Sequence, residues 1–367
     1  MALAVHGGDI FGAARRLGVP VSAIMDFSAN INPLGPSSMA RRRLREDLHL
    51  VCHYPDTCQA ELRSLVARHE NIDPDSILFG SGAMQLIHLV PRHFEPRKAL
   101  LVQPTFSEYA VALRLSGCQV RNYRLQPERN FRIEPNEFLR ALANERPDML
   151  ILGNPNNPTG TSTPPEVLSE ITTVCAKRRI HLVVDESFID FTTQPSLAGR
   201  ASQHRYLMVL RSFTKFFSLP GLRIGCLVAQ PSTVGALARE IEPWSVNTLG
   251  AIAAAESMKD SVFRKKSLAL AARERRYLSQ GLAKLGWLDP YPSEANFLLA
   301  RIKRRDVCAT DLRKELEIKR LLIRECTGFD GLGQQYIRLA IRTRRENRIL
   351  LEALREIGNV LENAREK

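Results

Sequence analysis

Short apolar runs that alternate with helical patterns constrain the fold of this 367-residue chain more than any other feature. The runs are four or five residues long, are rich in aliphatic and β-branched side chains and end at polar or turn-forming residues, which is typical of buried strands. Between the runs at residues 149–152 and 181–184, apolar side chains instead recur at the spacing of an amphipathic helix. Strands that alternate with helices favour an α/β fold with a mostly parallel sheet. The predicted strands are residues 99–102, 149–152, 181–184, 206–210 and 224–228, and the predicted helices are residues 60–69, 84–90 and 166–178.

The last third of the chain predicts a smaller α+β domain. A long charged helix is expected over residues 264–285, and a terminal helix is expected over residues 344–361, where leucine and isoleucine recur at helical spacing. Strand candidates lie between the two helices, at residues 296–302, 321–323 and 336–341. Two domains are also what a chain of this length favours.

Composition places the chain among ordinary globular proteins, with 44% hydrophobic and 25% charged residues. No apolar run approaches the ~18 residues of a membrane-spanning helix, and the first residues have neither the length nor the basic start of a signal peptide. The seven cysteines are scattered and form no C-x-x-C pair, which favours reduced thiols over a disulfide framework or a metal site. We therefore expect a cytoplasmic protein without a bound metal or a membrane partner.

The formal net charge of +13 has two interpretations. A basic surface could bind nucleic acid, but the basic clusters lie on predicted helix faces without interleaved aromatic residues, and no nucleic-acid-reading module is apparent. An anionic cofactor and a doubly anionic substrate fit the charge better, although they account for only a few of the basic residues. We therefore expect a small-molecule substrate and no nucleic-acid partner.

Lys215 lies just after a predicted strand and carries the most informative local pattern. Ser212 and Thr214 precede it, and Arg223 follows eight residues later. A lysine that forms a Schiff base with pyridoxal 5′-phosphate (PLP) needs nearby donors for the cofactor phosphate, and two hydroxyls and a guanidinium are suitable donors. Taken alone, the same pattern also fits a surface lysine after an edge strand.

Two further polar residues follow predicted strands. Asp185 ends the apolar run before it, and a buried carboxylate needs a cationic partner, such as the protonated pyridine nitrogen of PLP. Asn157 lies in the stiff turn 153–160, where a fixed amide could hydrogen-bond the ring oxygen of the cofactor. The alternatives are a helix cap or a structural ion pair for Asp185 and an ordinary turn for Asn157. Ligands of parallel sheets gather beyond the carboxyl ends of the strands, where Asn157, Asp185 and Lys215 all fall.

Five further segments, together with the residues around Lys215, Asp185 and Asn157, match the sequence pattern of a known family. They are residues 6–8, 26–35, 185–191, 243–247 and 322–324. With them, the chain from about Asp26 to its C-terminus resembles the fold-type I PLP-dependent enzymes, the aspartate aminotransferase superfamily. Within that superfamily it is most similar to the histidinol-phosphate aminotransferase branch and, in that branch, to the threonine-phosphate decarboxylases of cobalamin biosynthesis.

This resemblance implies a division of the chain into three parts. An N-terminal arm over residues 1–45 would contribute to the small domain and to the substrate site. A large PLP-binding domain with a mostly parallel sheet would follow over residues 46–245, and a small α+β domain over residues 246–367.

The resemblance also implies how PLP would be held. Lys215 would carry the cofactor, Asp185 would face its ring nitrogen and Asn157 its ring oxygen. Phe106 would stack on the ring, unless it is an ordinary core side chain. The implied phosphate-binding residues are Gly82, Ala83, Met84, Ser212, Thr214 and Arg223.

Two parts of this implied site have plainer alternatives. Residues 80–84 would serve equally well as a helix-opening turn. Tyr54 would reach the cofactor phosphate of the neighbouring subunit, which implies a homodimer with shared sites, but it could also be a turn residue beside Pro55.

The substrate would be held by a second group of side chains. Arg338 would grip the α-carboxylate, because a guanidinium can make two parallel hydrogen bonds to it, and Arg342 competes for this role. Asn32 would lie beside Arg338. His6 and Arg324 match groups near a substrate phosphate, although His6 alone would be an ordinary terminal histidine. The implied substrate-binding residues are His6, Asn32, Asn157, Arg324 and Arg338.

The activity implied by the resemblance is PLP-dependent decarboxylation of L-threonine O-3-phosphate to (R)-1-aminopropan-2-ol O-2-phosphate. The alternative, a histidinol-phosphate aminotransferase, would share the PLP residues and the need for a substrate phosphate. Phe188 favours the decarboxylase, because the aminotransferases usually carry tyrosine there. A PLP-binding or nucleic-acid-binding regulator without catalysis is a third alternative, and the intact set of Lys215, Asp185 and Arg338 argues against it.

Overall fold

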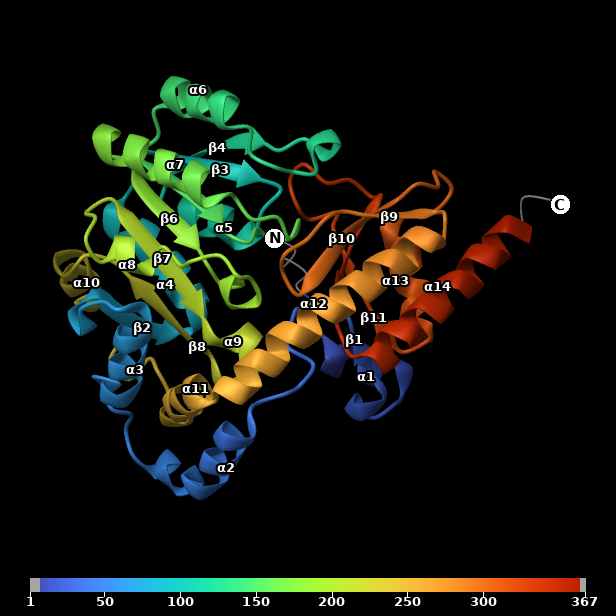
Figure 1. The fold of residues 1–367 in the computed structure, drawn as a ribbon, viewed down its shortest axis with the longest axis horizontal. Coiled ribbons are helices and arrows are strands. Elements are labelled where there is room, and N and C mark those ends of the chain that lie inside the picture. Colours follow the sequence, from blue (N-terminus) through green and yellow to red (C-terminus); the bar gives the residue numbers. More distant parts are fainter. Residues whose placement is uncertain (1–6, 364–367) are drawn as a thin grey trace.

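A seven-stranded sheet forms the centre of the larger part of the molecule (Figure 1). The structure, a computed structural model, describes residues 7–363, with side chains as far as residue 360. The strands of this sheet are β2 (Ile77–Ser81), β3 (Lys98–Gln103), β4 (Gln119–Arg124), β5 (Met149–Gly153), β6 (His181–Asp185), β7 (Leu207–Ser212) and β8 (Ile224–Val228). Their order is β2-β8-β7-β6-β5-β3-β4, and β8 runs antiparallel to the other six strands, which are parallel to one another. The predicted mostly parallel α/β sheet is therefore confirmed.

Every strand predicted for this sheet is present, but β2 and β4 were not predicted. β4 lies at the edge of the sheet, and its sequence is polar and largely exposed. Apolar runs report burial rather than strand pairing, so an exposed edge strand leaves no such run in the sequence.

Helices cover both faces of the large sheet. They are α3 (Ala60–Glu70), α4 (Gly82–Phe94), α5 (Ser107–Leu115), α6 (Pro135–Glu145), α7 (Pro165–Arg178), α8 (Ala198–Ala201), α9 (Phe213–Phe216) and α10 (Pro231–Ala238). Because side chains alternate along a strand, Val184 of β6 packs with α6, α7 and α8 on one face, whereas Val183 packs with α4, α5 and α10 on the other. The sheet is thus buried between two helical layers, as parallel sheets are.

A second, four-stranded antiparallel sheet forms the smaller part of the molecule (Figure 1). Its elements and those that surround it are β1 (Met25–Asp26), β9 (Leu288–Pro290), β10 (Phe297–Ile302), β11 (Leu321–Leu322), β12 (Arg324–Glu325), β13 (Tyr336–Ala340), α12 (Ser261–Lys284), α13 (Ala309–Ile318) and α14 (Arg344–Asn363). The strand order is β12-β13-β10-β9, and the sheet shares one core with α12, α13 and α14. β1 pairs in parallel with β11, so the N-terminal region joins this smaller part.

The long helix α12 links the two parts. The remaining elements are α1 (Ile10–Leu17), α2 (Ser38–Glu46), α11 (Thr248–Lys259) and the short 3-10 helices η1 (Val21–Ala23), η2 (Leu48–Cys52), η3 (Pro74–Ser76), η4 (Pro127–Arg129), η5 (Ile189–Phe191) and η6 (Pro220–Leu222). Phe263 and Ala271 of α12 pack with α3, α9 and α11, whereas Leu278 and Leu282 pack in the core of the small sheet. This packing favours a domain boundary within α12 over the expected one at residue 246, and the boundaries stay a prediction.

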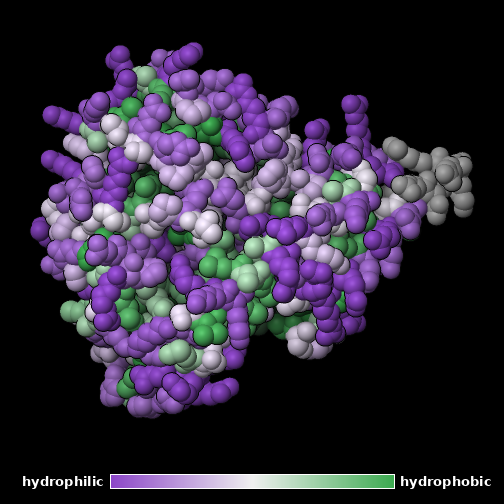
Figure 2. All heavy atoms as spheres, viewed as in Figure 1, coloured by the Kyte–Doolittle hydropathy of each residue, from purple (hydrophilic) through white to green (hydrophobic). Residues whose placement is uncertain are grey.

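Hydrophilic residues cover most of the outline in the space-filling view, while hydrophobic atoms gather toward the middle of this face (Figure 2). The basic clusters on α2 and α12 include exposed side chains such as those of Arg41 and Lys265. Between residues 7 and 363, no helix is long and apolar enough to cross a membrane.

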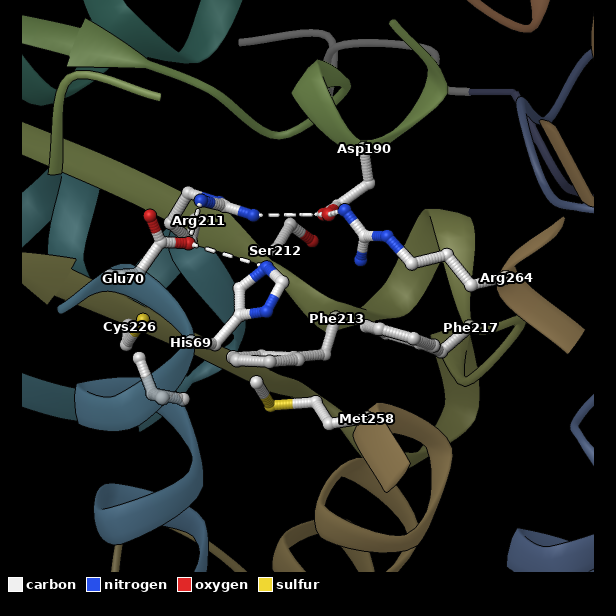
Figure 3. Close-up of a pocket in the computed structure, with 11 residues that line it drawn as sticks. His69, Glu70, Asp190, Arg211, Ser212, Phe213, Phe217, Cys226, Met258 and Arg264 are labelled. Carbon is white, nitrogen blue, oxygen red and sulfur yellow. Dashed lines mark hydrogen bonds and ion pairs between the residues drawn. The ribbon is translucent and has the colours of Figure 1, made fainter. Parts of the chain in front are cut away.

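An ionic cluster lies behind the ends of β6 and β7 (Figure 3). Arg211 donates from Nη2 to both oxygens of Asp190 at 3.1 Å and from Nη1 to Glu70. Arg264 of α12 donates to the same Asp190 at 2.9 Å. Burial raises the pKa of Glu186 to about 7, against the attraction of Arg211, which lies 3.9 Å away. The cluster ties α3, β7, η5 and α12 together.

Arg211→Met should destabilise the protein strongly. Breaking a buried ion pair by removing one partner costs about 3–5 kcal/mol, because the other charge stays buried without it. The midpoint of urea denaturation measures this loss. Arg129→Met is the control, because Arg129 and Glu137 form an exposed pair with 45% and 56% of their side chains accessible. Such an exposed pair contributes little to stability. Similar small losses for both variants would contradict the stabilising role of the cluster.

Candidate active site

A cavity of about 550 Å³ lies at the carboxyl ends of β5, β6 and β7 and is lined by both parts of the molecule. The residues of the predicted site that line it are Ala83, Met84, Phe106, Asn157, Asp185, Ser212, Thr214, Lys215, Arg223, Arg324 and Arg338. Gly82, Asn32 and Tyr54 are not among the residues that line it, and His6 lies outside the described residues. The carboxyl edge of the parallel sheet is therefore the place where most of the predicted site comes together.

Lys215 lies in α9, a single helical turn directly after β7. Its Nζ lies 2.9 Å from Thr214 Oγ1, to which it donates a hydrogen bond. Burial lowers the pKa of Lys215 to about 8, and the nearby charges of Arg223 and Arg338 act in the same direction while Asp185 opposes them. A lysine with a pKa this close to physiological pH has far more neutral, nucleophilic amine than an ordinary lysine, and the neutral amine is what condensation with an aldehyde requires.

Asp185 ends β6 and is held from two sides. Tyr109 Oη donates to Asp185 Oδ2 at 2.6 Å, and the backbone N–H of Ser187 donates to Oδ1 at 2.8 Å. Burial, together with the charge of Asp185, raises the pKa of Tyr109 well above its usual range. The phenol therefore stays protonated and fixes the carboxylate, so that the carboxylate is oriented for a cationic partner in the cavity.

Tyr109 was not predicted as a functional residue. A signal for it exists, because Tyr109 comes three residues after Phe106, about one turn later on the same face of a helix. The two rings meet edge to face, with their centroids 5.6 Å apart. Both residues line the cavity.

The start of α4 and the turn after β7 form a cradle that fits a phosphate group. The N-cap residue Ser81 makes no side-chain capping bond to the first turn of α4. The backbone N–H groups of that first turn therefore remain available to an anion. A Cβ at position 82 would lie 2.7 Å from Arg223 Nη2, and a Cβ at position 225 would lie 2.6 Å from the backbone nitrogen of Ala83. Glycine at both positions keeps the cradle open.

Two hydroxyls complete this cradle. Ser212 Oγ and Thr214 Oγ1 lie 2.7 Å apart and share a hydrogen bond, and both residues line the cavity with Arg223. Backbone N–H groups, hydroxyls and a guanidinium together are suitable donors for the phosphate of PLP. The residues present therefore fit the predicted cofactor.

Arg324 and Arg338 lie directly opposite each other on the paired strands β12 and β13. They are only 9% and 6% exposed, and burial lowers the pKa of both, that of Arg338 to about 10. Like charges that face each other across a strand pair are destabilising. An anionic ligand would relieve this repulsion, so the pair marks the anion-binding wall of the cavity.

Arg338, rather than Arg342, faces the cavity. Arg338 donates to the side-chain oxygen of Asn157 and, at 2.7 Å, to the carbonyl of Ser28, while its buried Nε has no partner among the described residues. Arg342 is instead paired with Glu346 at 2.6 Å and does not line the cavity. Glu346 thus pairs with Arg342 outside the cavity, and Arg338 is the arginine of the two that can bind a ligand there.

Asn32 does not occupy the place that the resemblance implies. Its side-chain Nδ2 donates to the carbonyl of Phe216 at 2.8 Å and to Ser267 Oγ at 2.7 Å, so that both amide hydrogens are used. Asn30, two residues earlier, does line the cavity, and its buried Oδ1 has no partner in the described part of the chain. The backbone N–H of Ile31 donates to the carbonyl of Ala29 at 2.9 Å, so the chain turns here instead of running as a regular strand, and the sequence alone did not reveal that Asn30 and Asn32 have different surroundings.

The aromatic residues divide into two groups. Phe188 lines the cavity and packs edge to face against Phe297, with ring centroids 5.0 Å apart. Tyr54 lies elsewhere, with 79% of its surface exposed, and stacks on Trp244 at a centroid distance of 4.4 Å. Tyr54 therefore contributes nothing to the cavity of its own chain.

The N-terminal arm reaches the cavity through Gly7 and Gly8. The backbone N–H of Gly8 donates to Ser28 Oγ at 2.8 Å, and Ser28 Oγ in turn donates to Asp26 Oδ1 at 2.6 Å. A Cβ at Gly7 would lie 2.2 Å from the carbonyl oxygen of Ser28. The absence of a side chain at Gly7 is thus what lets the arm approach the wall that holds Arg338.

The lowered pKa of Lys215 predicts how the apoprotein captures PLP. Only the neutral amine attacks the aldehyde, so the capture rate should rise with pH and level off above the lysine pKa of about 8. Stopped-flow absorbance of the lysine-bound cofactor between pH 6 and 10 measures this rate. A rate that rises without a plateau to pH 10 would show a lysine with an ordinary pKa. Lys215→Ala should form no such species.

Comparison with known proteins agrees with this site. The family model for aminotransferase class I and II matches residues 22–354. A threonine-phosphate decarboxylase of Salmonella typhimurium is 38% identical over 354 residues, which cover 96% of either chain. The crystal structure of an L-threonine-O-3-phosphate decarboxylase from Porphyromonas gingivalis superposes with a TM-score of 0.80 at 26% identity, covering 93% of this chain and 99% of that one. A histidinol-phosphate aminotransferase from Clostridium acetobutylicum superposes with a TM-score of 0.84 at 27% identity, covering 91% and 98%.

The predicted resemblance to threonine-phosphate decarboxylases is confirmed by these matches, as is the fold that it implied. The match to the family model extends over most of the chain and includes both strand systems and Lys215. The chain belongs to aminotransferase class I and II, a family of PLP-dependent enzymes.

Proposed function

We propose that this enzyme decarboxylates L-threonine O-3-phosphate to (R)-1-aminopropan-2-ol O-2-phosphate, a step of adenosylcobalamin biosynthesis. The observation that carries the proposal is the opposed pair Arg324 and Arg338 in the wall of the cavity that holds Lys215. A substrate with a carboxylate at one end and a phosphate at the other supplies an anion to each guanidinium. The relatives named as threonine-phosphate decarboxylases support the same substrate.

The proposed reaction breaks the bond between Cα and the carboxylate carbon, releases CO2 and adds a proton at Cα. PLP, when bound, supplies the electron sink that accepts the electron pair of this bond. Asp185, fixed by Tyr109, would keep the ring nitrogen protonated. Lys215, or a water molecule, would return the proton to Cα.

Orientation of the substrate decides which bond at Cα breaks. The breaking bond must stand perpendicular to the cofactor ring, so a decarboxylase has to fix the carboxylate there and an aminotransferase the hydrogen. We propose that Arg338 and Asn157 bind the carboxylate, and that Arg324, with Asn30 and His6, binds the phosphate. Anchoring both ends of a small substrate in this way leaves it little rotational freedom.

We further infer a homodimer in which Tyr54 reaches the cofactor phosphate of the partner subunit. Tyr54 and Trp244 form an exposed aromatic pair, and the exposed Leu48 and Val51 lie close by in the sequence. Apolar surface of this kind is typical of a protein interface. A cytoplasmic location is proposed because the seven cysteines, all resolved as free thiols, fit a reducing compartment.

The activity assay separates the proposal from its alternative. The purified PLP-loaded enzyme should release CO2 from threonine phosphate, and Lys215→Ala should release none. Transamination of histidinol phosphate with 2-oxoglutarate, without CO2 release from threonine phosphate, would instead establish the aminotransferase.

Arg338→Lys should lower kcat/KM for threonine phosphate while PLP stays bound. An ammonium group cannot make the two parallel hydrogen bonds of a guanidinium, and losing a charge-assisted hydrogen bond costs about 1.5–3 kcal/mol, or about a ten- to hundredfold loss. Arg342→Lys is the matched control, because Arg342 lies four residues further along the chain and outside the cavity. Equal kinetic losses in the two variants would remove Arg338 from the carboxylate site.

A further inference from the structure

We propose that Asn32 is a positioning residue that holds the backbone of Lys215, and that it acts on the reaction through Lys215 rather than by binding substrate. This inference deepens the proposed function and rests on the part of it that assigns the cofactor to Lys215. It starts from the shortness of the helix that carries the lysine. α9 contains four residues, Phe213–Phe216, and its carbonyls accept only a few local hydrogen bonds, such as that from the N–H of Ser218 to Lys215 at 3.4 Å, so groups from elsewhere add to the stability of its last turn.

Asn32 donates hydrogen bonds to two carbonyl groups at the end of α9. Its backbone N–H donates to the carbonyl of Lys215 at 3.1 Å, and its side-chain Nδ2 donates to the carbonyl of Phe216 at 2.8 Å. Asn32 and Phe216 are 184 residues apart in the sequence. The last carbonyls of a helix need outside partners when they are buried, and here one distant residue supplies donors to both.

The same side chain fastens α9 to the long helix α12. Nδ2 also donates to Ser267 Oγ at 2.7 Å, and Oδ1 accepts from the backbone N–H of Leu34 at 3.1 Å. Asn32 and Ser267 are only 2% and 1% exposed. With both amide hydrogens committed inside the protein, Asn32 has no donor left for a substrate in the cavity.

The segment that contains Asn32 also fixes the substrate side of the cavity. The carbonyl of Ser28 accepts from Arg338 at 2.7 Å, and the carbonyl of Asn30 accepts from Asn296 at 3.0 Å. Residues 28, 30 and 32 therefore connect the carboxylate-binding arginine, the small sheet and the lysine turn in one stretch of chain. Through this stretch, Asn32 helps to fix the position of Lys215 relative to Arg338.

Loss of the Asn32 side chain would change the position of the Lys215 amine. Without the amide, the carbonyl of Phe216 and the hydroxyl of Ser267 would be buried without this donor, which is unfavourable. A single helical turn can relax to recover those bonds, and Lys215 Nζ would move with it. A displacement of about 1 Å at a reacting group is enough to cost about a hundredfold in rate.

The test compares Asn32→Ala with Ser267→Ala and with the control Asn347→Ala. Asn347 is also fully buried, and its side chain also binds backbone, donating to the carbonyl of Arg342 at 2.9 Å, but it lies at the start of α14. Each variant is loaded with PLP, and the absorbance of the lysine-bound cofactor is titrated with pH before any substrate is added. Then kcat and KM for threonine phosphate are measured.

Asn32→Ala should shift the midpoint of the absorbance titration by about 0.5 pH units or more and lower kcat by about tenfold or more, with KM changed by less than about threefold. Ser267→Ala should shift the midpoint in the same direction by a smaller amount. Asn347→Ala should leave the midpoint and kcat unchanged even where it lowers the thermal unfolding temperature.

An unchanged midpoint with a raised KM in Asn32→Ala would overturn the inference and make Asn32 a substrate ligand. If Asn32→Ala does not fold, Ser267→Ala decides, and an unchanged midpoint there would overturn it as well. Because the titration contains no substrate, its result is independent of the substrate proposed. A shifted midpoint in an enzyme that releases no CO2 would support the role of Asn32 and refute the decarboxylase.

Discussion

Parallel pairing of β5, β6 and β7 is the constraint on which the rest of the site depends. Parallel strands end at a common edge, so Asn157, Asp185 and Lys215 meet there although about thirty residues separate each from the next along the chain. Strand alternation then divides neighbouring residues between two faces. Asp185 and Ser212 face the cavity, whereas the residues next to them, Glu186 and Arg211, enter the ionic cluster behind it.

Positive charge dominates the inner surface of the cavity. Lys215, Arg223, Arg324 and Arg338 all line it, and the mutual repulsion adds to burial in lowering the pKa of Lys215 and of Arg338. An anion that enters such a site gains from every one of these charges, and its binding favours their protonated forms. The phosphate of the cofactor and the two anionic groups of the proposed substrate are therefore complementary to the same electrostatic feature.

Local sequence patterns predicted the elements whose side chains are buried together and missed features that depend on distant partners. Apolar runs marked β3, β5, β6, β7 and β8, but the polar edge strand β4 left no such signal. Arg338 was preferred to Arg342 from the sequence, and Glu346, the carboxylate that pairs with Arg342, lies only four residues further along the chain. Asn32 was expected beside the substrate, yet its partners Phe216 and Ser267 lie 184 and 235 residues away, and no local pattern encodes such contacts.

The N-terminal segment explains how one cofactor site could be specialised for breaking a carbon–carbon bond. The choice between Cα–H and Cα–carboxylate depends on where the carboxylate anchor lies relative to the ring of the cofactor that Lys215 holds, and a small change in that relation rotates a different bond into the reactive orientation. Ser28 holds Arg338 and Asn32 holds the lysine turn, and the two residues are only four positions apart in the sequence. A span this short varies little in length, whereas the path between Lys215 and Arg338 through the chain crosses both sheets. The segment around residues 28–32 is therefore the element through which a change of sequence would most directly alter the bond that is cleaved, while the cofactor contacts of the large sheet stay as they are.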